Sequence, residues 1–491
     1  MIKSDYFRFS WWAALTILLS AFLLFQVQPV ISKMILPWFG GSTAVWTTCM
    51  LFFQVLLVAG YVYAHWLSRL KSRRLQMIVH LLLIVLALAT LPITPAERFK
   101  PTDSSLPTLR ILWLLLVHIG LPYFILSSTG PLVQAWYALR YPGRSPYRLY
   151  ALSNVGSLGA LVTYPFLFEP AFDLSTQGTL WSCVFVTFGI CCGLLAVSIS
   201  RKGNSAESVV EGDSTGKKSR LAESPPLKMD RWNWVWMPAL ASLMLLAITQ
   251  HVCQEVVVIP FLWIAPLSLY LLSFIICFDR ETWYRPRVYA WLTFLAVSWV
   301  AAVMLRYEID AVLEKGGFGF KFSNFSNSVL VQISSYLWML FVICMLCHGE
   351  LTRRKPAVSH LTSFYLSVSV GGAIGGLLVS LICPLVFDSY LELQLSMLGA
   401  LIFSATIVVA QILPWRAAGQ LSAALLLGAG FGLFFKAQLG EYQRNVKSFD
   451  VEKKIQRETV LARRNFFGVL RVVRETHEDD SYDNHMTLMH G

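Results

Sequence analysis

Polar residues that interrupt long apolar stretches are the first candidates for chemistry in this sequence. Gln250, His251, Gln254 and Glu255 crowd together in ITQHVCQEVVVIP. Inside a membrane, a carboxylate such as Glu255 needs a charged partner or takes up a proton, so it can bind a cation or relay a proton. The alternative is a carboxylate that lies in water at the membrane surface, and the sequence leaves both interpretations open.

Two further polar residues lie in apolar stretches of the first half of the chain. Gln28 precedes a proline in FLLFQVQPVISK, where its amide either satisfies the backbone carbonyl that the proline frees or faces a ligand. Asn154 lies in LYALSNVGSLGA, where small and polar side chains favour close helix packing. We predict a speculative substrate-binding set of Glu255, Gln250, Gln28 and Asn154.

Glycines form a separate pattern in SVGGAIGGLLVS. Gly371, Gly372, Gly375 and Gly376 make overlapping GxxxG motifs, which are typical of closely packed membrane helices. They do not make a nucleotide-binding loop, which requires a strand before the glycines. We therefore predict that these four glycines pack one helix against another.

The cysteines do not predict a metal or catalytic centre. The nine cysteines lie in or beside apolar stretches, where cysteine behaves as a small hydrophobic residue. Cys344 and Cys347 form a CxxC motif without a second pair. No metal ligand and no catalytic residue is predicted.

Membrane helices must position these residues. The chain has 491 residues, of which 56% are hydrophobic and 14% are charged, whereas a soluble protein carries about 25% charged residues. Apolar runs recur that are long enough to cross a bilayer core of about 30 Å, and in lipid such runs must be helical. The fold class predicted is an all-α polytopic membrane protein with about thirteen spans. The predicted spans are 10–33, 43–67, 75–94, 109–138, 147–168, 177–199, 234–255, 260–279, 287–305, 327–347, 361–386, 394–413 and 417–436.

The spans divide into two halves, as in major-facilitator (MFS) transporters. Residues 1–200 form a first half of six helices, and residues 231–436 form a second half of about seven helices. Residues 201–230, rich in Ser, Gly, Lys and Glu, are predicted to be a flexible cytoplasmic linker. The tail, 437–491, is predicted to be soluble, with a charged helix up to Arg464 and strands over 467–473 and 485–490.

The distribution of charge predicts orientation and location. The net charge of +12 comes from short basic clusters between spans, which is a topology signal and not a nucleic-acid surface. These clusters fall on one side if the amino terminus is cytoplasmic, and we predict a multi-pass protein of the inner, cytoplasmic membrane. Thirteen spans place the tail outside, whereas a re-entrant hairpin over 394–436 returns it to the cytoplasm.

Several stretches together resemble one family. The membrane part of bacterial fused MFS transporter-like/spermidine synthase-like proteins is similar to FLLFQVQPVISKMILPWFGGSTAVWTTCMLFFQ, PYRLYALSNVGSLGALVTYPFLFEP, IPFLWIAPLSLYLLSF, CHGEL and FYLSVSVGGAIGGLLVSLICPLVFD. RNFFGVLRV resembles the linker and first strand of their carboxyl-terminal domain. The family often has an aspartate where Glu255 stands, which keeps a carboxylate at that position.

The resemblance implies a membrane bundle joined to an aminopropyltransferase-like domain with a Rossmann-like methyltransferase fold. That domain would bind decarboxylated S-adenosylmethionine or a related nucleoside through a glycine-rich loop that follows a strand. Gly491 falls within its opening hairpin, so the resemblance implies no catalytic residue and no cofactor for this chain, and no enzymatic activity is expected of it alone.

Three functions stay open on this basis. The first is a transporter-like or binding module for a polyamine or another small cation, which carboxylate and aromatic groups would suit. The second is a membrane anchor for a separately encoded spermidine synthase-like domain. The third is a truncated, inactive product. The lipid bilayer is a partner in each case, and nucleic acid in none.

Overall fold

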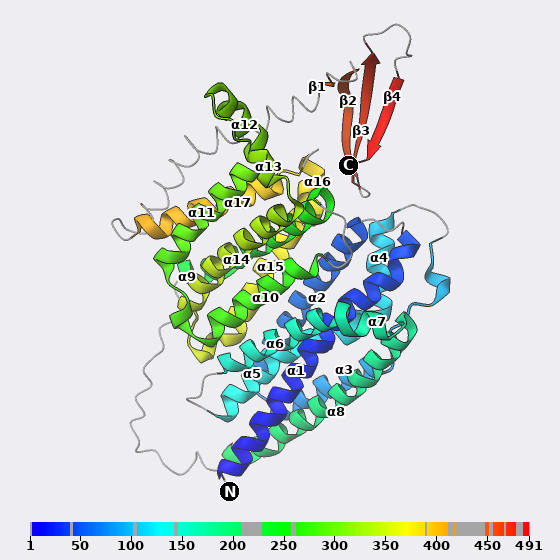
Figure 1. Cartoon of the computed structure of the whole chain (residues 1–491). Coiled ribbons are helices and arrows are strands. Elements are labelled where there is room, and N and C mark those ends of the chain that lie inside the picture. The colour runs from blue at the N-terminus through cyan, green and yellow to red at the C-terminus, as the bar shows by residue number, and fades with distance from the viewer. Residues whose placement is uncertain are drawn as a thin grey trace.

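The computed structural model describes residues 2–39, 43–101, 106–141, 146–207, 228–256, 262–387, 390–410, 417, 447–450, 455–465, 468–477 and 485–490. Within these residues the chain forms a bundle of long helices followed by a small sheet (Figure 1). The helices are α1 (Ile2–Ile35), α2 (Thr43–Arg69), α3 (Arg73–Leu88), α4 (Pro107–Leu115), α5 (Leu121–Arg140), α6 (Tyr147–Thr163), α7 (Glu169–Ala171), α8 (Leu174–Glu207), α9 (Lys228–His251), α10 (Ile264–Asp279), α11 (Pro286–Met304), α12 (Arg306–Lys315), α13 (Phe322–Ser326), α14 (Val329–Arg353), α15 (Leu361–Leu377), α16 (Cys383–Val386) and α17 (Glu392–Val409).

The bundle confirms the all-α polytopic membrane class. Ten helical segments among the described residues are long and apolar enough to cross a membrane, and each matches a predicted span. The predicted spans 75–94 and 260–279 correspond to α3 and α10, which have 16 residues each and are therefore about 24 Å long at 1.5 Å per residue. The predicted span 417–436 lies outside the described residues, except for Ala417, so the side of the membrane that receives the tail stays a prediction.

Four of the long segments contain a π-helical turn near a proline. Leu116–Gly120 joins α4 to α5 just before Pro122, and Leu378–Ile382 joins α15 to α16 just before Pro384. Tyr164–Phe168 joins α6 to α7, and Val252–Val256 follows α9. Proline lacks the N–H that would continue the helical ladder, and π-turns of this kind often mark functional sites in helices.

The two halves of the bundle repeat one arrangement of helices. In the first half α1 packs on α6, α2 on α5 and α3 on α8; in the second, α9 packs on α15, α10 on α14 and α11 on α17. When the six spans of each half are numbered in order, these are the same pairs: first with fifth, second with fourth, third with sixth. This repeat is the layout of major-facilitator transporters, as the order of spans predicted.

Glycine allows the first–fifth contact in each half. A Cβ on Gly375 of α15 would lie 2.5 Å from the Ala239 carbonyl oxygen of α9, and one on Gly371 would overlap the Val235 carbonyl. In the equivalent pair of the first half, a Cβ on Gly156 of α6 would lie 2.9 Å from the carbonyl oxygen of Leu18 in α1. Any larger residue would therefore push the two helices apart.

The other two glycines of the motif behave differently from each other. A Cβ on Gly376 would overlap the side-chain amide of Gln54 in α2, so this glycine lies at the contact between the halves. A Cβ on Gly372 would meet nothing within 4 Å, because this residue lies on the wall of a cavity. The Gly372 carbonyl nevertheless accepts a hydrogen bond from Ser242 Oγ of α9 at 2.9 Å, so the role of Gly372 in helix packing stays a prediction.

The predicted linker is shorter than the sequence indicates. Helix α8 continues to Glu207 and α9 begins at Lys228, so both ends of the predicted stretch 201–230 are helical. The residues between them lie outside the described part of the chain. Polar composition alone places a helix end too early, because the last turn of a membrane helix extends into water with charged side chains.

The tail contains a four-stranded antiparallel sheet in the order β1-β2-β3-β4, formed by Lys447–Asp450, Ile455–Asn465, Gly468–His477 and His485–His490 (Figure 1). Strands β3 and β4 confirm the two predicted strands. The predicted helix up to Arg464 is wrong, because Ile455–Asn465 pairs along its length with β3.

Candidate functional site: a cavity between the two halves

A cavity of about 180 Å³ lies where the two halves meet. Two helix pairs bring the halves together around it: α2 packs on α15, and α6 packs on α10. Its lining residues are Ser20, Ala21, Leu24, Phe25 and Gln28 of α1; Met50, Phe53, Gln54, Leu57 and Tyr61 of α2; Tyr123, Leu126, Ser127 and Gly130 of α5; Tyr150, Ser153, Asn154 and Ser157 of α6; and Ser242, Leu245, Leu267, Tyr270, Leu271, Phe274, Val368, Ser369, Gly372 and Ala373 of the second half.

The lining is mostly apolar and carries no charge among the described residues. Its polar groups are amides, hydroxyls and phenols. Gln28 Nε2 donates to the Tyr123 hydroxyl at 3.4 Å and to the Leu24 carbonyl at 3.3 Å, and Asn154 Nδ2 donates to the Tyr150 carbonyl at 3.1 Å. These hydrogen bonds hold the two amides in place at the wall.

Two polar atoms of the wall have no hydrogen-bond partner within the described part of the chain. They are the amide oxygen of Gln54 and the hydroxyl of Ser369, and both atoms are buried. Ser369 is 7% exposed, and Gln54 lies against Gly376 across the contact between the halves. Buried polar groups without partners are uncommon in folded proteins, and both of these belong to residues of the cavity wall.

Aromatic rings form one side of the cavity. Tyr150 stacks on Tyr365 with ring centroids 4.8 Å apart and meets Phe274 edge-on at 5.9 Å. Tyr270 meets Phe274 edge-on at 5.3 Å. Phe274 in turn stacks on His348 at 3.6 Å. Aromatic side chains therefore line the part of the cavity wall that α6 and α10 provide.

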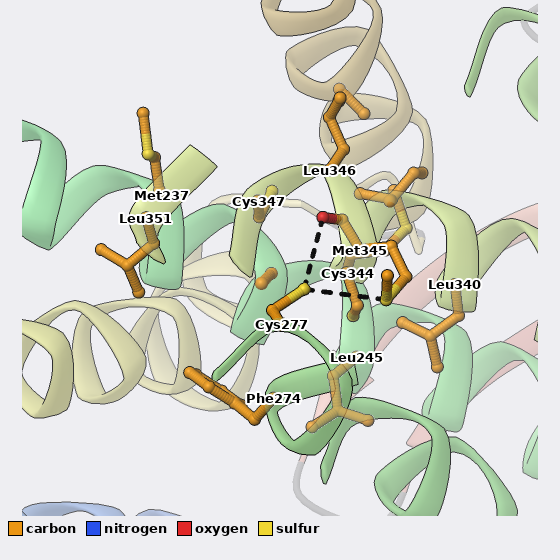
Figure 2. Close-up of a cluster of buried hydrophobic side chains, with 14 of the residues drawn as sticks. Met237, Leu245, Phe274, Cys277, Leu340, Cys344, Met345, Leu346, Cys347 and Leu351 are labelled. Atoms are coloured by element: carbon orange, nitrogen blue, oxygen red, sulfur yellow. Dashed lines mark hydrogen bonds between the residues drawn. The ribbon is translucent and has the colours of Figure 1, made fainter. Parts of the chain in front are cut away.

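Phe274 also belongs to a sulfur-rich core, which Figure 2 shows around Cys277. Cys277 approaches the Met345 sulfur at 3.8 Å, and Cys344 and Cys347 are fully buried nearby. His348 is also fully buried, with Nδ1 2.8 Å from the Ser273 hydroxyl. The described residues contain no group of His, Cys, Asp and Glu that could hold a metal ion, and these cysteines pack among apolar side chains.

The structure brings together only part of the predicted site. Gln28 and Asn154 line the cavity. Gln250 is half-buried near the end of α9 and is not among the residues that line the cavity. The backbone of Glu255 lies in the π-helical turn Val252–Val256, and its side chain lies outside the described residues.

The predicted site left out Gln54, Ser369 and the tyrosines of the wall. Gln54 is a polar residue within an apolar span, the same signal that singled out Gln28. Ser369 and Tyr150 give no such signal, because serine and tyrosine are common in membrane helices. Only the pairing of α2 with α15 and of α6 with α10 places them around one cavity.

One end of the bundle is basic, and there the halves are joined by hydrogen bonds. Arg69, Arg140 and Arg353 end their helices at this end, which we call the basic end. Three bonds cross between the halves: Tyr147 hydroxyl to the Pro356 carbonyl at 2.7 Å, His65 Nδ1 to Thr362 Oγ1 at 2.8 Å, and Tyr365 hydroxyl to Gln134 Oε1 at 2.8 Å.

A buried ion-pair network supports the loop that carries Pro356. Glu350, 1% exposed, pairs with Arg353 at 2.8 Å and with Arg354, and it accepts a hydrogen bond from the Tyr284 hydroxyl at 3.1 Å. Burial and the adjacent carboxylate raise the pKa of Tyr284 well above its usual value, so its hydroxyl stays a donor. Trp234 Nε1 donates to the Arg354 carbonyl at 2.8 Å and completes the support of the loop.

The opposite end of the cavity is joined by aromatic rings. Trp46, at the start of α2, and Trp263, just before α10, have ring centroids 5.2 Å apart. Each lies about one turn before a residue of the cavity wall, Met50 and Leu267. The halves therefore contact each other on both sides of the cavity, through polar bonds at the basic end and indole rings at the other.

Comparison with solved structures finds membrane transporters. A bacterial homologue of the iron transporter ferroportin in an outward-facing state matches with a TM-score of 0.48 and 14% identity over 84% of this chain and 100% of that one. The peptide transporter POT in complex with sulfate matches with a TM-score of 0.47 and 13% identity over 84% of this chain and 95% of that one. A POT family transporter in complex with 5-aminolevulinic acid gives 0.41 and 12% over 81% and 95%.

No family model and no curated protein matches the sequence. At these identities and TM-scores the solved structures carry no argument about substrate. The chain's own contacts show a multi-pass helical bundle of two halves with a cavity at its centre.

Proposed function

We propose that this chain is a membrane transporter that binds a small solute in the central cavity and exposes it alternately to the two sides of the membrane. The observation that carries the proposal is the position of the cavity. It lies between two halves with the same helix arrangement, and the halves touch at both of its ends. Rocking of two such halves about a central site is the way many secondary transporters work.

The nature of the inter-half contacts supports this motion. Beyond the packing of α2 on α15 and of α6 on α10, the two ends are joined by different contacts: hydrogen bonds at the basic end and one pair of indole rings at the other. Each hydrogen bond adds only about 0.5–1.5 kcal/mol net, because water replaces it when it breaks. Contacts of this size can open at one end while the other end closes.

The family resemblance adds a substrate, a location and a partner to this proposal. A polyamine or other small cation is supported by the aromatic faces of Tyr150, Tyr270 and Phe274, which can attract a cation. The described wall offers no carboxylate beside them, and Glu255 is the one predicted group that could supply it. Location in the inner membrane with a cytoplasmic amino terminus is likewise part of the proposal.

A role as membrane anchor for a separate spermidine synthase-like domain is supported by the tail. Strands β3 and β4 lie where the resemblance places the opening hairpin of that domain. Co-purification of the full chain with such a domain, and its loss when Val472 in β3 is replaced by proline, would support anchoring. Equal recovery with and without the substitution would contradict it.

The proposed transport cycle can be tested without knowing the substrate. Ser153→Cys places a thiol in the cavity wall, and a membrane-impermeant thiol reagent is added to vesicles of either orientation. Alternating access predicts modification of residue 153 from both sides, measured by peptide mass spectrometry. The fully buried native Cys344 serves as the unmodified control. Modification from a single side would contradict the transporter proposal.

A further inference from the structure

We propose that the ligand of the central cavity is a neutral small molecule with hydrogen-bond donors beside a flat or apolar face. This inference rests on the proposed function and deepens it, because it names the chemical class of the substrate. It departs from the polyamine expectation. Three features of the described wall support it: its neutrality, its unpartnered acceptors and its aromatic side.

Neutrality is the first feature. The described lining contains amides, hydroxyls, phenols and apolar groups, and no Lys, Arg, Asp, Glu or His. An ion that leaves water for such a wall has no opposite charge to replace its hydration, which costs several kcal/mol for one charge. A polyamine carries several charges, so the cost multiplies. Aromatic faces return only about 0.5–2 kcal/mol for each cation.

The second feature is the pair of unpartnered atoms. The amide oxygen of Gln54 can only accept a hydrogen bond, and the hydroxyl of Ser369 can accept or donate. They come from α2 and α15, the helix pair that joins the halves on one side of the cavity. Both atoms are covered in this structure, Gln54 Oε1 by Gly376, so a ligand donates to them only after the two side chains turn toward the cavity; a ligand that then reaches both would bridge the two halves. By contrast, the amides of Gln28 and Asn154 already donate to protein groups.

The third feature is the set of aromatic side chains on a second part of the cavity wall. Tyr150, Tyr270 and Phe274 come from α6 and α10, the other helix pair that joins the halves. Rings of this kind bind a planar or apolar surface by stacking and dispersion. A ligand between the two walls therefore meets hydrogen-bond acceptors from α2 and α15 and ring faces from α6 and α10.

The test uses isosteric probes with the full chain in lipid nanodiscs. Benzamide is neutral and donates two N–H groups; benzamidinium is its cation, benzoate its anion, and N,N-dimethylbenzamide its neutral form without donors. Binding is measured by ligand-observed saturation-transfer NMR, with spermidine as competitor. We expect benzamide to bind about tenfold more tightly than each of the other three, since an unpaired charge or an unmet acceptor costs at least that much.

A matched pair of variants locates the binding. Gln54→Met removes the amide and keeps the length, and it should weaken benzamide about tenfold and abolish its advantage over N,N-dimethylbenzamide. Gln26→Met is the control, because Gln26 is also buried with an unpartnered amide oxygen, on α1, but does not line the cavity. It should leave every affinity unchanged.

The outcomes separate this inference from the proposed function. Tighter binding of benzamidinium or benzoate, displacement of benzamide by spermidine, or no binding of benzamide would overturn the inference. So would equal effects of Gln54→Met and Gln26→Met. None of these results affects the test of transport, which is the modification of Ser153→Cys from both sides of the membrane. Modification from one side only would overturn the transport proposal.

Discussion

The two ends of the cavity are built from different chemistry. At the basic end the halves meet through three polar hydrogen bonds, and the loop that carries one acceptor is fixed by the buried carboxylate of Glu350. At the opposite end they meet through the indole rings of Trp46 and Trp263. Water competes for a hydrogen bond but not for a ring contact, so the two ends respond to different changes.

Because the contacts differ in kind, both ends of the cavity can be closed in one structure while each end is still able to open. Directional bonds at the basic end require the loop after α14 to be in one place, and the ion-pair network provides that place. The ring contact tolerates small shifts because dispersion is not directional. We call the contacts that close each end of the cavity a latch. We infer that the latch at the basic end closes in one geometry only, whereas the latch at the aromatic end tolerates small shifts.

The largest effect is expected from Glu350→Gln. The substitution leaves the shape of the side chain but removes the charge that pairs with Arg353 and Arg354, and breaking a buried ion pair costs about 3–5 kcal/mol. A fall in the apparent unfolding temperature in detergent should report it. Glu314→Gln, at an exposed position in α12, is the control and should leave that temperature unchanged. Equal temperatures for both variants would show that the network does not support the latch.

Trp46→Ala should have the next largest effect. It removes the ring contact with Trp263 and the apolar area that goes with it, so the end opposite the basic end should open more often. We expect modification of Ser153→Cys from that side to rise about tenfold, a change of roughly 1.4 kcal/mol. Trp66→Ala, an exposed tryptophan near the end of α2, is the control. A rise from the basic side instead would reverse the assignment of the two ends.

Gly376→Ala should act on the cavity wall and not on either latch. The added methyl group overlaps the amide of Gln54 and pushes this side chain aside, at a cost near 1 kcal/mol because the amide is the far end of a flexible chain. Benzamide affinity should fall about fivefold. Gly159→Ala, where an added Cβ meets nothing within 4 Å, should change nothing. If both substitutions have the same effect, the contact between Gly376 and Gln54 has no role in binding.

Tyr147→Phe is the smallest change. It removes one hydroxyl that bonds to the Pro356 carbonyl and leaves the ring in place, so the basic end loses about 1 kcal/mol of closing free energy. Modification of Ser153→Cys from the basic side should rise about threefold to fivefold. Tyr307→Phe removes a hydroxyl that bonds to Asn327 at 3.2 Å outside the bundle core and serves as the control. No change in Tyr147→Phe would mean that the remaining bonds hold the end by themselves.

Helices were predictable because each long apolar run carries its own signal, and ten of them reappear within a few residues of their predicted bounds. The contacts of Gly371 and Gly375 were readable in the same way, since close helix contact requires glycine. The cavity was not, because it depends on which helices become neighbours: Gln54 and Ser369 line one cavity only through the pairing of α2 with α15. Gly372 illustrates what the sequence pattern does not distinguish. It follows Gly371 by one residue, and a Cβ at this position would point into the cavity instead of toward α9.

Strand β2 shows a second limit. Its register shifts between Thr459 and Leu461, so Val460 is an extra residue opposite β3. A bulge of this kind moves the following side chains to the other face and breaks the alternation that identifies a strand. The segment therefore reads as a charged helix when taken alone, and long-range pairing with β3 decides otherwise.

The most direct test compares the sidedness of Ser153→Cys modification in the Trp46→Ala and Tyr147→Phe backgrounds. The same reagent, vesicles and peptide readout are used, and the ratio of modification from the two sides is measured for each. We predict that the ratio shifts in opposite directions, toward the aromatic end in Trp46→Ala and toward the basic end in Tyr147→Phe. A shift in the same direction, or no shift in either, would contradict a central cavity that opens alternately at two ends.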